Sequence, residues 1–161
     1  MLPPSLHELD RIRDACYSLV TLRSSASAVA AIVPVPGIDV GADVTILLEM
    51  LPTINRKFGL SEEQVDELDP HTKKLILVAA TSIGSEIIAR TVTKQVVISI
   101  LKKVSLRLAT KQVTKWIPFA GQAIAGAISF GAMKYVGNSH VDDCYEVAKK
   151  AILGSTPPHI A

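Results

Sequence analysis

The side chains best suited to chemistry in this sequence are His140 and Cys144. They are four residues apart, a spacing that can place two side chains next to each other on one face of an α-helix. An imidazole beside a thiol could hold part of a metal site or form the base and nucleophile of a hydrolase. Both chemistries need a further ligand or a third group that orients the base, and no such partner is evident in the sequence. We therefore predict no catalytic residue and no metal site.

The sequence contains no motif for nucleotide or calcium binding. A phosphate-binding loop of the form G-x-x-x-x-G-K-[ST] is missing. The acidic run "EEQVDELD" lacks the glycine and the ligand spacing of a calcium loop. His7, His71 and His159 fall near expected helix ends or in the tail, which is typical of surface residues. We expect a protein that is not an enzyme and that needs no cofactor.

The elements that position these side chains are all predicted to be helices. The start signals are Ser5, Asp39, Ser61 and the pair Asp69–Pro70, and the stop signals are Gly59, Gly84, and Gly137 with Asn138. A long helical pattern runs from residue 85 to residue 117. We expect an all-α, compact multi-helix bundle forming one domain over residues 1–161. Its parts are an N-terminal helix region at 5–33, middle helices at 39–117, a C-terminal helical hairpin at 121–153 and a tail at 154–161.

Two helices rich in small residues follow similar turns, "PVPG" and "PFAG". We interpret the turns as entries to two central helices, in which small side chains let another backbone approach closely. The predicted helix-packing residues are Pro34, Gly37, Pro118, Gly121, Ala123, Ala127 and Gly131. The charge-free window from Trp116 to Met133 touches the lower length limit for a membrane-spanning helix. Its proline, glutamine and three glycines make it a weak spanning segment, so a buried helix is the preferred interpretation and membrane insertion the alternative.

Length and cysteine content indicate one domain in a reducing compartment. A chain of 161 residues can bury a core without disulfides, and two distant cysteines, Cys16 and Cys144, do not form a disulfide framework. The N-terminal sequence has no basic end followed by an apolar run, so we expect no signal peptide. The expected location is cytoplasmic, with peripheral association to internal membranes.

Charge is distributed unevenly along the chain. The net charge is only +2, yet residues 72–117 carry 9 basic and 1 acidic side chains while residues 1–71 carry 5 basic and 11 acidic ones. The predicted membrane- or partner-binding residues are Arg90, Lys94, Lys102, Lys103, Arg107, Lys111 and Lys115. An apolar stripe beside them predicts an amphipathic helix that could lie on an anionic membrane, contact an acidic partner, or pack on the core with a solvated basic face. No nucleic-acid-binding motif is present, and we expect no nucleic acid partner.

The segment "AIVPVPGIDVGADVTILLEMLPTINRKFGLSEEQVDEL" resembles the C-terminal helical domain of the immunity-related, interferon-inducible GTPases. In that family a P-x-P-G turn precedes a helix with an aspartate and an aliphatic run, followed by F-G-L and a short acidic helix. The matching residues are Pro34, Pro36, Gly37, Asp43, Ile46 to Leu48, and Phe58 to Leu60. Near the C-terminus, "PFAGQAIAGAISFGAMKYV" is similar to the family's closing helix, with Ala125, Gly126, Ser129 and Phe130 matching its core. The resemblance covers about residues 26–153 and includes none of the GTP-binding domain.

The resemblance implies a role for the helical part, and it carries no claim of GTP hydrolysis. In that family, amphipathic segments of the helical domain help direct the protein to internal membranes and to vacuoles around intracellular pathogens, which places it in innate immunity. We expect a non-enzymatic helical module that binds anionic membranes peripherally and contacts a protein partner, with a GTPase or a like domain as the expected partner. The alternatives are a membrane-inserting, pore-forming toxin or effector and a regulatory protein-interaction domain that binds no lipid. The sequence leaves the oligomeric state open.

Overall fold

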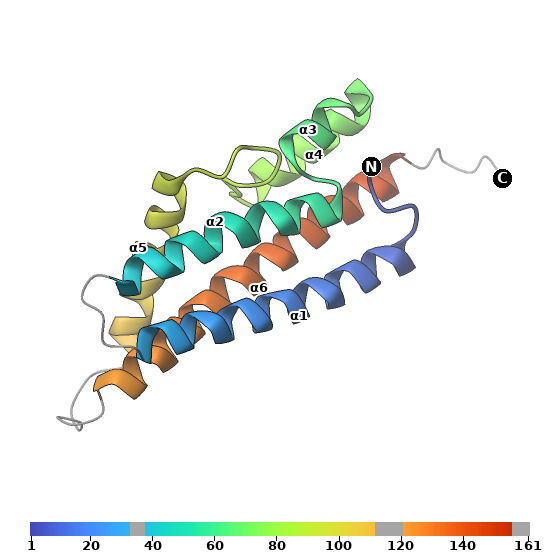
Figure 1. Ribbon diagram of the computed structural model, residues 1–161. Coiled ribbons are helices and arrows are strands. Elements are labelled where there is room, and N and C mark those ends of the chain that lie inside the picture. The colour runs from blue at the N-terminus through green and yellow to red at the C-terminus, as the bar shows by residue number, and fades with distance from the viewer. Residues whose placement is uncertain (33–37, 112–120, 156–161) are drawn as a thin grey trace. The chain divides into compact units, whose positions relative to one another are not determined.

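The computed structural model describes residues 1–32, 38–111 and 121–155 (Figure 1). Side chains are described for residues 1–26, 43–104 and 130–155. The helices in these ranges are α1 (Leu6–Ile32), α2 (Ile38–Phe58), α3 (Glu62–Asp66), α4 (Pro70–Ser82), α5 (Lys94–Lys111) and α6 (Gly121–Ser155). No strand occurs within the described ranges, which confirms the all-α prediction for them. The two P-x-x-G turns lie largely outside these residues, so their predicted role is not described.

The chain forms two units. Unit 1 comprises Met1–Tyr17, Leu51–Val92 and His140–Ala161, and unit 2 comprises Ser18–Met50 and Thr93–Ser139. Helices α1, α2 and α6 contribute residues to both units, whereas α3 and α4 belong to unit 1 and α5 belongs to unit 2.

Unit 1 packs the first part of α1 and the last parts of α2 and α6 with α3 and α4. Among its described residues, the fully buried large side chains include Leu9, Leu51, Ile54, Phe58, Leu60, Val65, Ile76 and Ile88. Helix α4 is tied to α6 by a hydrogen bond between Thr72 Oγ1 and Ser155 Oγ at 3.2 Å. Aliphatic burial from several helices is the main source of stability in such a core, at about 25 cal/mol per Å² of apolar surface.

Unit 2 packs the remaining parts of α1, α2 and α6 with α5. The buried apolar side chains that the structure describes in it are Val20, Val44, Leu47, Met50, Val97, Val104, Ala132, Met133 and Val136. An ion pair between Arg23 Nη1 and Glu49 Oε2, at 3.4 Å, joins α1 to α2 at the exposed surface. Such an exposed pair contributes at most about 1 kcal/mol, so the apolar contacts dominate this unit as well.

Several local signals in the sequence correctly predict helix ends. Ser61 caps α3 in a reciprocal capping box with Gln64, and the Asp69 side chain accepts hydrogen bonds from the backbone of His71 and Thr72 at the start of α4. Gly59 follows α2 with φ +74°, and a Cβ there would lie 2.5 Å from the Met1 carbonyl oxygen. Glycine is therefore required at position 59 by both the backbone conformation and the close approach of the N-terminal segment.

Three predicted helix boundaries are wrong. Helix α2 begins at Ile38, so Asp39 lies within its first turn rather than at its cap. The helix predicted from residue 85 begins only at Lys94, because residues 83–93 form turns in which the Ser85 hydroxyl accepts from the backbone of Ile87 and Ile88. The predicted C-terminal hairpin is a single helix, since α6 continues through Gly137 to Ser155.

Candidate functional site

The predicted cationic residues do not all share one helix. Arg90 is exposed, but it lies in the turn segment before α5 and belongs to unit 1. Lys94, Lys102 and Lys103 lie on α5 in unit 2, and all three are exposed. The prediction of one continuous basic helix from Arg90 is therefore wrong, and the described cationic surface consists of Lys94, Lys102 and Lys103, which we call the α5 lysines.

The α5 lysines have no acidic counterpart on their own helix. The sequence of α5 contains no aspartate or glutamate, and none of the three lysines forms an ion pair with another described residue. On the opposite side, Val97 and Val104 are buried with 0% and 7% of their surface exposed. In the part of α5 that the structure describes, the predicted amphipathic character is therefore present.

Several other predicted site residues cannot be placed. For five of them the structure describes the helix but not the surroundings of the residue: Arg107, Lys111, Gly121, Ala123 and Ala127. Four others lie outside the described residues: Pro34, Gly37, Lys115 and Pro118. Their predicted roles in binding or helix packing therefore stay predictions.

Among the glycines of α6 whose surroundings the structure describes, Gly137 and Gly154 lie close against other side chains, whereas the predicted Gly131 does not. A Cβ added to Gly131 would meet no described atom within 4 Å. A Cβ added to Gly137 would lie 2.6 Å from Val20 Cγ1 and 3.0 Å from Met50 Cε. Glycine at 137 therefore makes room for α1 and α2 side chains inside unit 2, and it lies within α6 rather than at its end.

Three polar side chains meet in the core of unit 1. Asn55 of α2 and His140 and Cys144 of α6 are all buried. The Asn55 amide donates to the Ile87 carbonyl oxygen at 3.0 Å, so its Oδ1 is directed toward the other two side chains. Asn55 Oδ1 lies 2.9 Å from His140 Nε2 and accepts from Cys144 Sγ at 3.4 Å. One asparagine thus links α2, α6 and the turn segment before α5.

Burial determines the protonation of this buried trio. It lowers the pKa of His140 to about 4, opposed only in part by a hydrogen bond with the Leu51 backbone. The pKa of Cys144 is raised well above its ordinary value, first by burial and then by the nearby Asp143 and Cys16. A reactive cysteine needs an accessible thiolate, whereas this one is a protonated and enclosed thiol. The trio is thus suited to satisfying buried polar groups and to fixing a tertiary contact.

The third member of this trio was missed from sequence. His140 and Cys144 stand out because their spacing brings them together on one helix, but Asn55 lies 85 residues from His140 in the chain. The available signal was a polar residue on the apolar face of α2, which also carries Leu51, Ile54 and Phe58. A polar residue on a buried helix face requires a hydrogen-bond partner, and the sequence alone did not indicate which.

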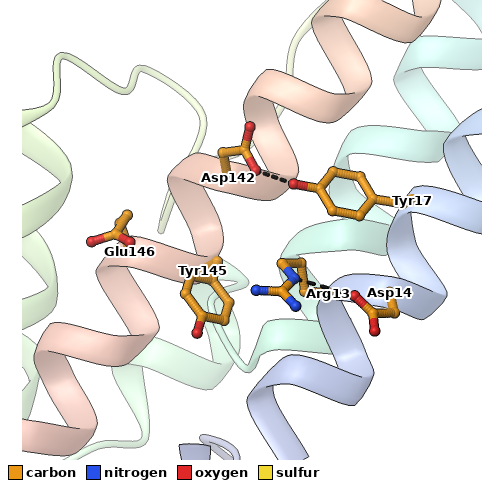
Figure 2. A pocket seen from close by; sticks show the side chains of 6 residues that line it. All are labelled: Arg13, Asp14, Tyr17, Asp142, Tyr145 and Glu146. Carbon is orange, nitrogen blue, oxygen red and sulfur yellow. Dashed lines mark hydrogen bonds and ion pairs between the residues drawn. The ribbon is translucent and has the colours of Figure 1, made fainter.

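A shallow cleft of about 420 Å³ lies between α1 and α6 in unit 1, and we call it the α1/α6 cleft (Figure 2). Its lining residues are Arg13, Asp14 and Tyr17 from α1 and Asp142, Tyr145 and Glu146 from α6. Figure 2 shows the Tyr17 hydroxyl directed at Asp142, to which it donates a hydrogen bond. The Tyr145 hydroxyl donates to Asp10 Oδ1 at 2.8 Å. Sequence analysis did not predict this cleft, because its residues are ordinary surface types from opposite ends of the chain.

Charge in the α1/α6 cleft is dominated by carboxylates. The Arg13 guanidinium lies 3.3 Å from Asp10 and 3.2 Å from Asp14, and 4.9 Å from the centre of the Tyr145 ring. The hydrogen bond to Asp142, together with partial burial, raises the pKa of Tyr17 to about 12. The lining thus holds three carboxylates and one guanidinium, with the phenols neutral.

Neither a metal cluster nor a spanning helix is found in the part of the chain that the structure describes. No group of three or more histidine, cysteine, aspartate or glutamate side chains there is arranged to hold a metal ion. None of the helices, over their described residues, combines the length and the apolar character needed to cross a bilayer.

Comparison with known proteins identifies two relatives. The chain is 28% identical over 156 residues to a Bos taurus protein named Interferon-inducible GTPase 5, and 27% identical over 156 residues to the Rattus norvegicus protein of that name. Each match covers 92% of this chain and 33% of the relative, so the chain spans about a third of the length of these relatives. No family model matches the sequence, and no solved structure matches it. The resemblance inferred from the sequence motifs is thereby confirmed as a distant similarity to an interferon-inducible GTPase over nearly the whole of this chain.

Proposed function

We propose that this chain is a non-enzymatic helical module that attaches peripherally to anionic membranes and contacts a protein partner. The α5 lysines bind the membrane surface. The expected setting is the cytoplasmic side of internal membranes, in innate immunity, and the expected partner is a GTPase or a like domain. The distant similarity to proteins named as interferon-inducible GTPases supports this setting and this partner.

The observation that carries the proposal is the uncompensated charge of α5. Lys94, Lys102 and Lys103 are exposed on a helix that has no acidic residue, while Val97 and Val104 are buried on its other side. A helix held to the protein by one face can present the charged face to lipid headgroups. Because these lysines form no ion pair with a described residue, they give up no described ionic partner when they approach an anionic surface.

The expected attachment is weak and reversible. Each basic side chain near an anionic membrane contributes about 1 kcal/mol, so the three α5 lysines supply about 3 kcal/mol. Electrostatic attraction of this size is screened at physiological salt, where the Debye length falls to about 8 Å. The proposal therefore predicts binding that depends on anionic lipid and weakens as salt is added.

Flotation of the protein with liposomes tests the proposal. Wild type should float with phosphatidylserine-containing vesicles and not with pure phosphatidylcholine vesicles. Replacing Lys102 and Lys103 with glutamate removes about 2 kcal/mol of attraction, which lowers vesicle binding about thirtyfold before repulsion by the new carboxylates is counted. Circular dichroism should show unchanged helix content.

A matched control separates local from overall charge. Lys74→Glu with Lys150→Glu makes the same change in net charge at exposed positions on α4 and α6, and this variant should float nearly as wild type does. Equal losses in the two variants would show that only overall charge matters and would contradict a specific α5 surface. Dye release from the floated vesicles would instead support insertion, and the absence of flotation at any salt would support a protein-interaction domain that binds no lipid.

A further inference from the structure

The walls of the α1/α6 cleft are held in place before any ligand arrives. Both tyrosine hydroxyls are engaged, Tyr17 with Asp142 and Tyr145 with Asp10. Arg13 is bound between Asp10 and Asp14 and rests over the Tyr145 ring. Side chains that are already fixed lose little conformational freedom when a ligand binds, so this cleft can bind a partner without first being ordered.

Among the described residues, the three carboxylates that line this cleft outnumber the two cations beside it, Arg13 and Lys149, whose Nζ lies 5.7 Å from the centre of the Tyr145 ring. Its one arginine faces three lining carboxylates, and Glu146 is exposed and forms no ion pair with another described residue. Asp142 and Glu146 are four residues apart on α6, a spacing that places them on one face of the helix with their Cβ atoms about 5–6 Å apart. Next to them, burial and the charge of Asp142 raise the pKa of Asp143. A cation that enters the cleft would weaken the repulsion between these neighbouring carboxylates.

The α5 lysines have the complementary property. They are exposed cations on a helix without acidic residues, and no described residue forms an ion pair with them. Lys102 and Lys103 are both exposed, and each carries its ammonium group on a long, flexible stem that can turn toward a carboxylate on another molecule. The same chain therefore carries a pre-formed acidic cleft in unit 1 and an unpaired basic surface in unit 2.

We propose that the α1/α6 cleft of one copy binds the α5 lysines of a second copy, so that the chain self-associates head to tail. The contact joins two different surfaces, which makes it heterologous, and each copy in an assembly still offers one free cleft or one free set of lysines. If the proposed membrane binding holds, self-association and the membrane compete for the same lysines. That competition rests on the proposed function, whereas the self-association does not.

The strength of this contact follows from its exposed position. An exposed ion pair contributes up to about fivefold in affinity, so neutralising two carboxylates should weaken association by up to about 25-fold. Salt should weaken it further, because the Debye length falls from about 30 Å at 0.01 M to about 8 Å at 0.15 M. We expect association to be detectable at low salt and high protein concentration.

Analytical ultracentrifugation with complementary variants tests the proposal. The wild-type average mass should rise above 17.2 kDa with protein concentration at low salt and return to that value at 0.15 M salt, near the physiological range. The cleft variant, Asp142→Asn with Glu146→Gln, keeps an acceptor for the Tyr17 hydroxyl and should stay monomeric. The lysine variant, Lys102→Glu with Lys103→Glu, should also stay monomeric.

Mixing the two variants gives the decisive result. The lysine variant has an intact cleft and the cleft variant has intact lysines, so the mixture should form a dimer that grows no further. A wild type that is monomeric at every concentration, a cleft variant that associates as wild type does, or a mixture that stays monomeric would each overturn the proposal. The cleft variant should still float with anionic liposomes, so a failure of self-association leaves the proposed membrane binding to be judged separately.

Discussion

Replacing His140 with glutamine should make the protein less sensitive to acid. The imidazole is enclosed in unit 1, where its Nε2 lies 2.9 Å from Asn55 Oδ1 and, in the neutral ring, donates to it. Glutamine places an amide near the position of Nε2, so it can still donate to Asn55, but it cannot take up a proton in this range. We expect His140→Gln to lower stability at neutral pH, because the ring is lost from a packed site, and to flatten the dependence of stability on pH.

The magnitude follows from the pKa of this one residue. Burial lowers it from 6.5 to about 4 in the folded protein, so the unfolded state takes up the proton first as the pH falls. The contribution of neutral His140 to stability is complete above about pH 6.5 and is lost progressively down to about pH 4. Below that pH the loss from this residue stays constant. The total loss is about 3 kcal/mol, at about 1.4 kcal/mol for each unit of pKa shift.

Urea unfolding followed by circular dichroism measures this effect. The free energy of unfolding is determined for wild type and His140→Gln at intervals between pH 8 and pH 4. Carboxylates common to both proteins contribute equally, so they cancel when the two free energies of unfolding are subtracted. The value for wild type minus the value for His140→Gln should fall by about 3 kcal/mol between pH 8 and pH 4. Parallel curves for the two proteins would refute the assignment of a buried neutral histidine.

Three further predictions concern packing and buried hydrogen bonds, and each is checked by urea unfolding. Gly131→Ala should raise the free energy of unfolding by about 0.5–1 kcal/mol, because its Cβ would meet no atom within 4 Å and alanine favours a helix. Gly137→Ala should instead lower it by about 1 kcal/mol or more, because its Cβ would lie 2.6 Å from Val20 Cγ1; a gain would contradict the close approach. Asn55→Ala should lower it by about 2–4 kcal/mol, because the Ile87 carbonyl and the α6 donors lose their partner, and a neutral result would refute the linking role.

Local signals predicted much of the fold. Ser61, Asp69 and the glycines at 59 and 84 mark helix ends and turns through interactions with residues close in the sequence, so their roles can be predicted from the neighbouring sequence. The role of Gly137 was predicted wrongly because a glycine can end a helix or make room for a neighbouring side chain. Only the tertiary structure shows that Val20 occupies the space that a side chain at position 137 would fill.

The candidate sites were predicted less completely because they join distant parts of the chain. The amphipathic character of α5 follows from spacing along one helix, so it was visible in the sequence. The buried trio and the α1/α6 cleft depend on pairs such as Asn55 with His140 and Tyr17 with Asp142, which are 85 and 125 residues apart. No periodicity in one sequence indicates which distant side chains will meet.

The most direct test of the proposed function is the binding of wild type to vesicles with increasing phosphatidylserine content, measured by co-sedimentation at low and at physiological salt. We predict that bound protein rises steeply with anionic lipid, falls at least tenfold as salt reaches about 0.15 M, and falls similarly when Lys102 and Lys103 become glutamate. Binding that is independent of lipid charge, or no binding at the lowest salt, would contradict the assignment of the α5 lysines as a membrane-binding surface.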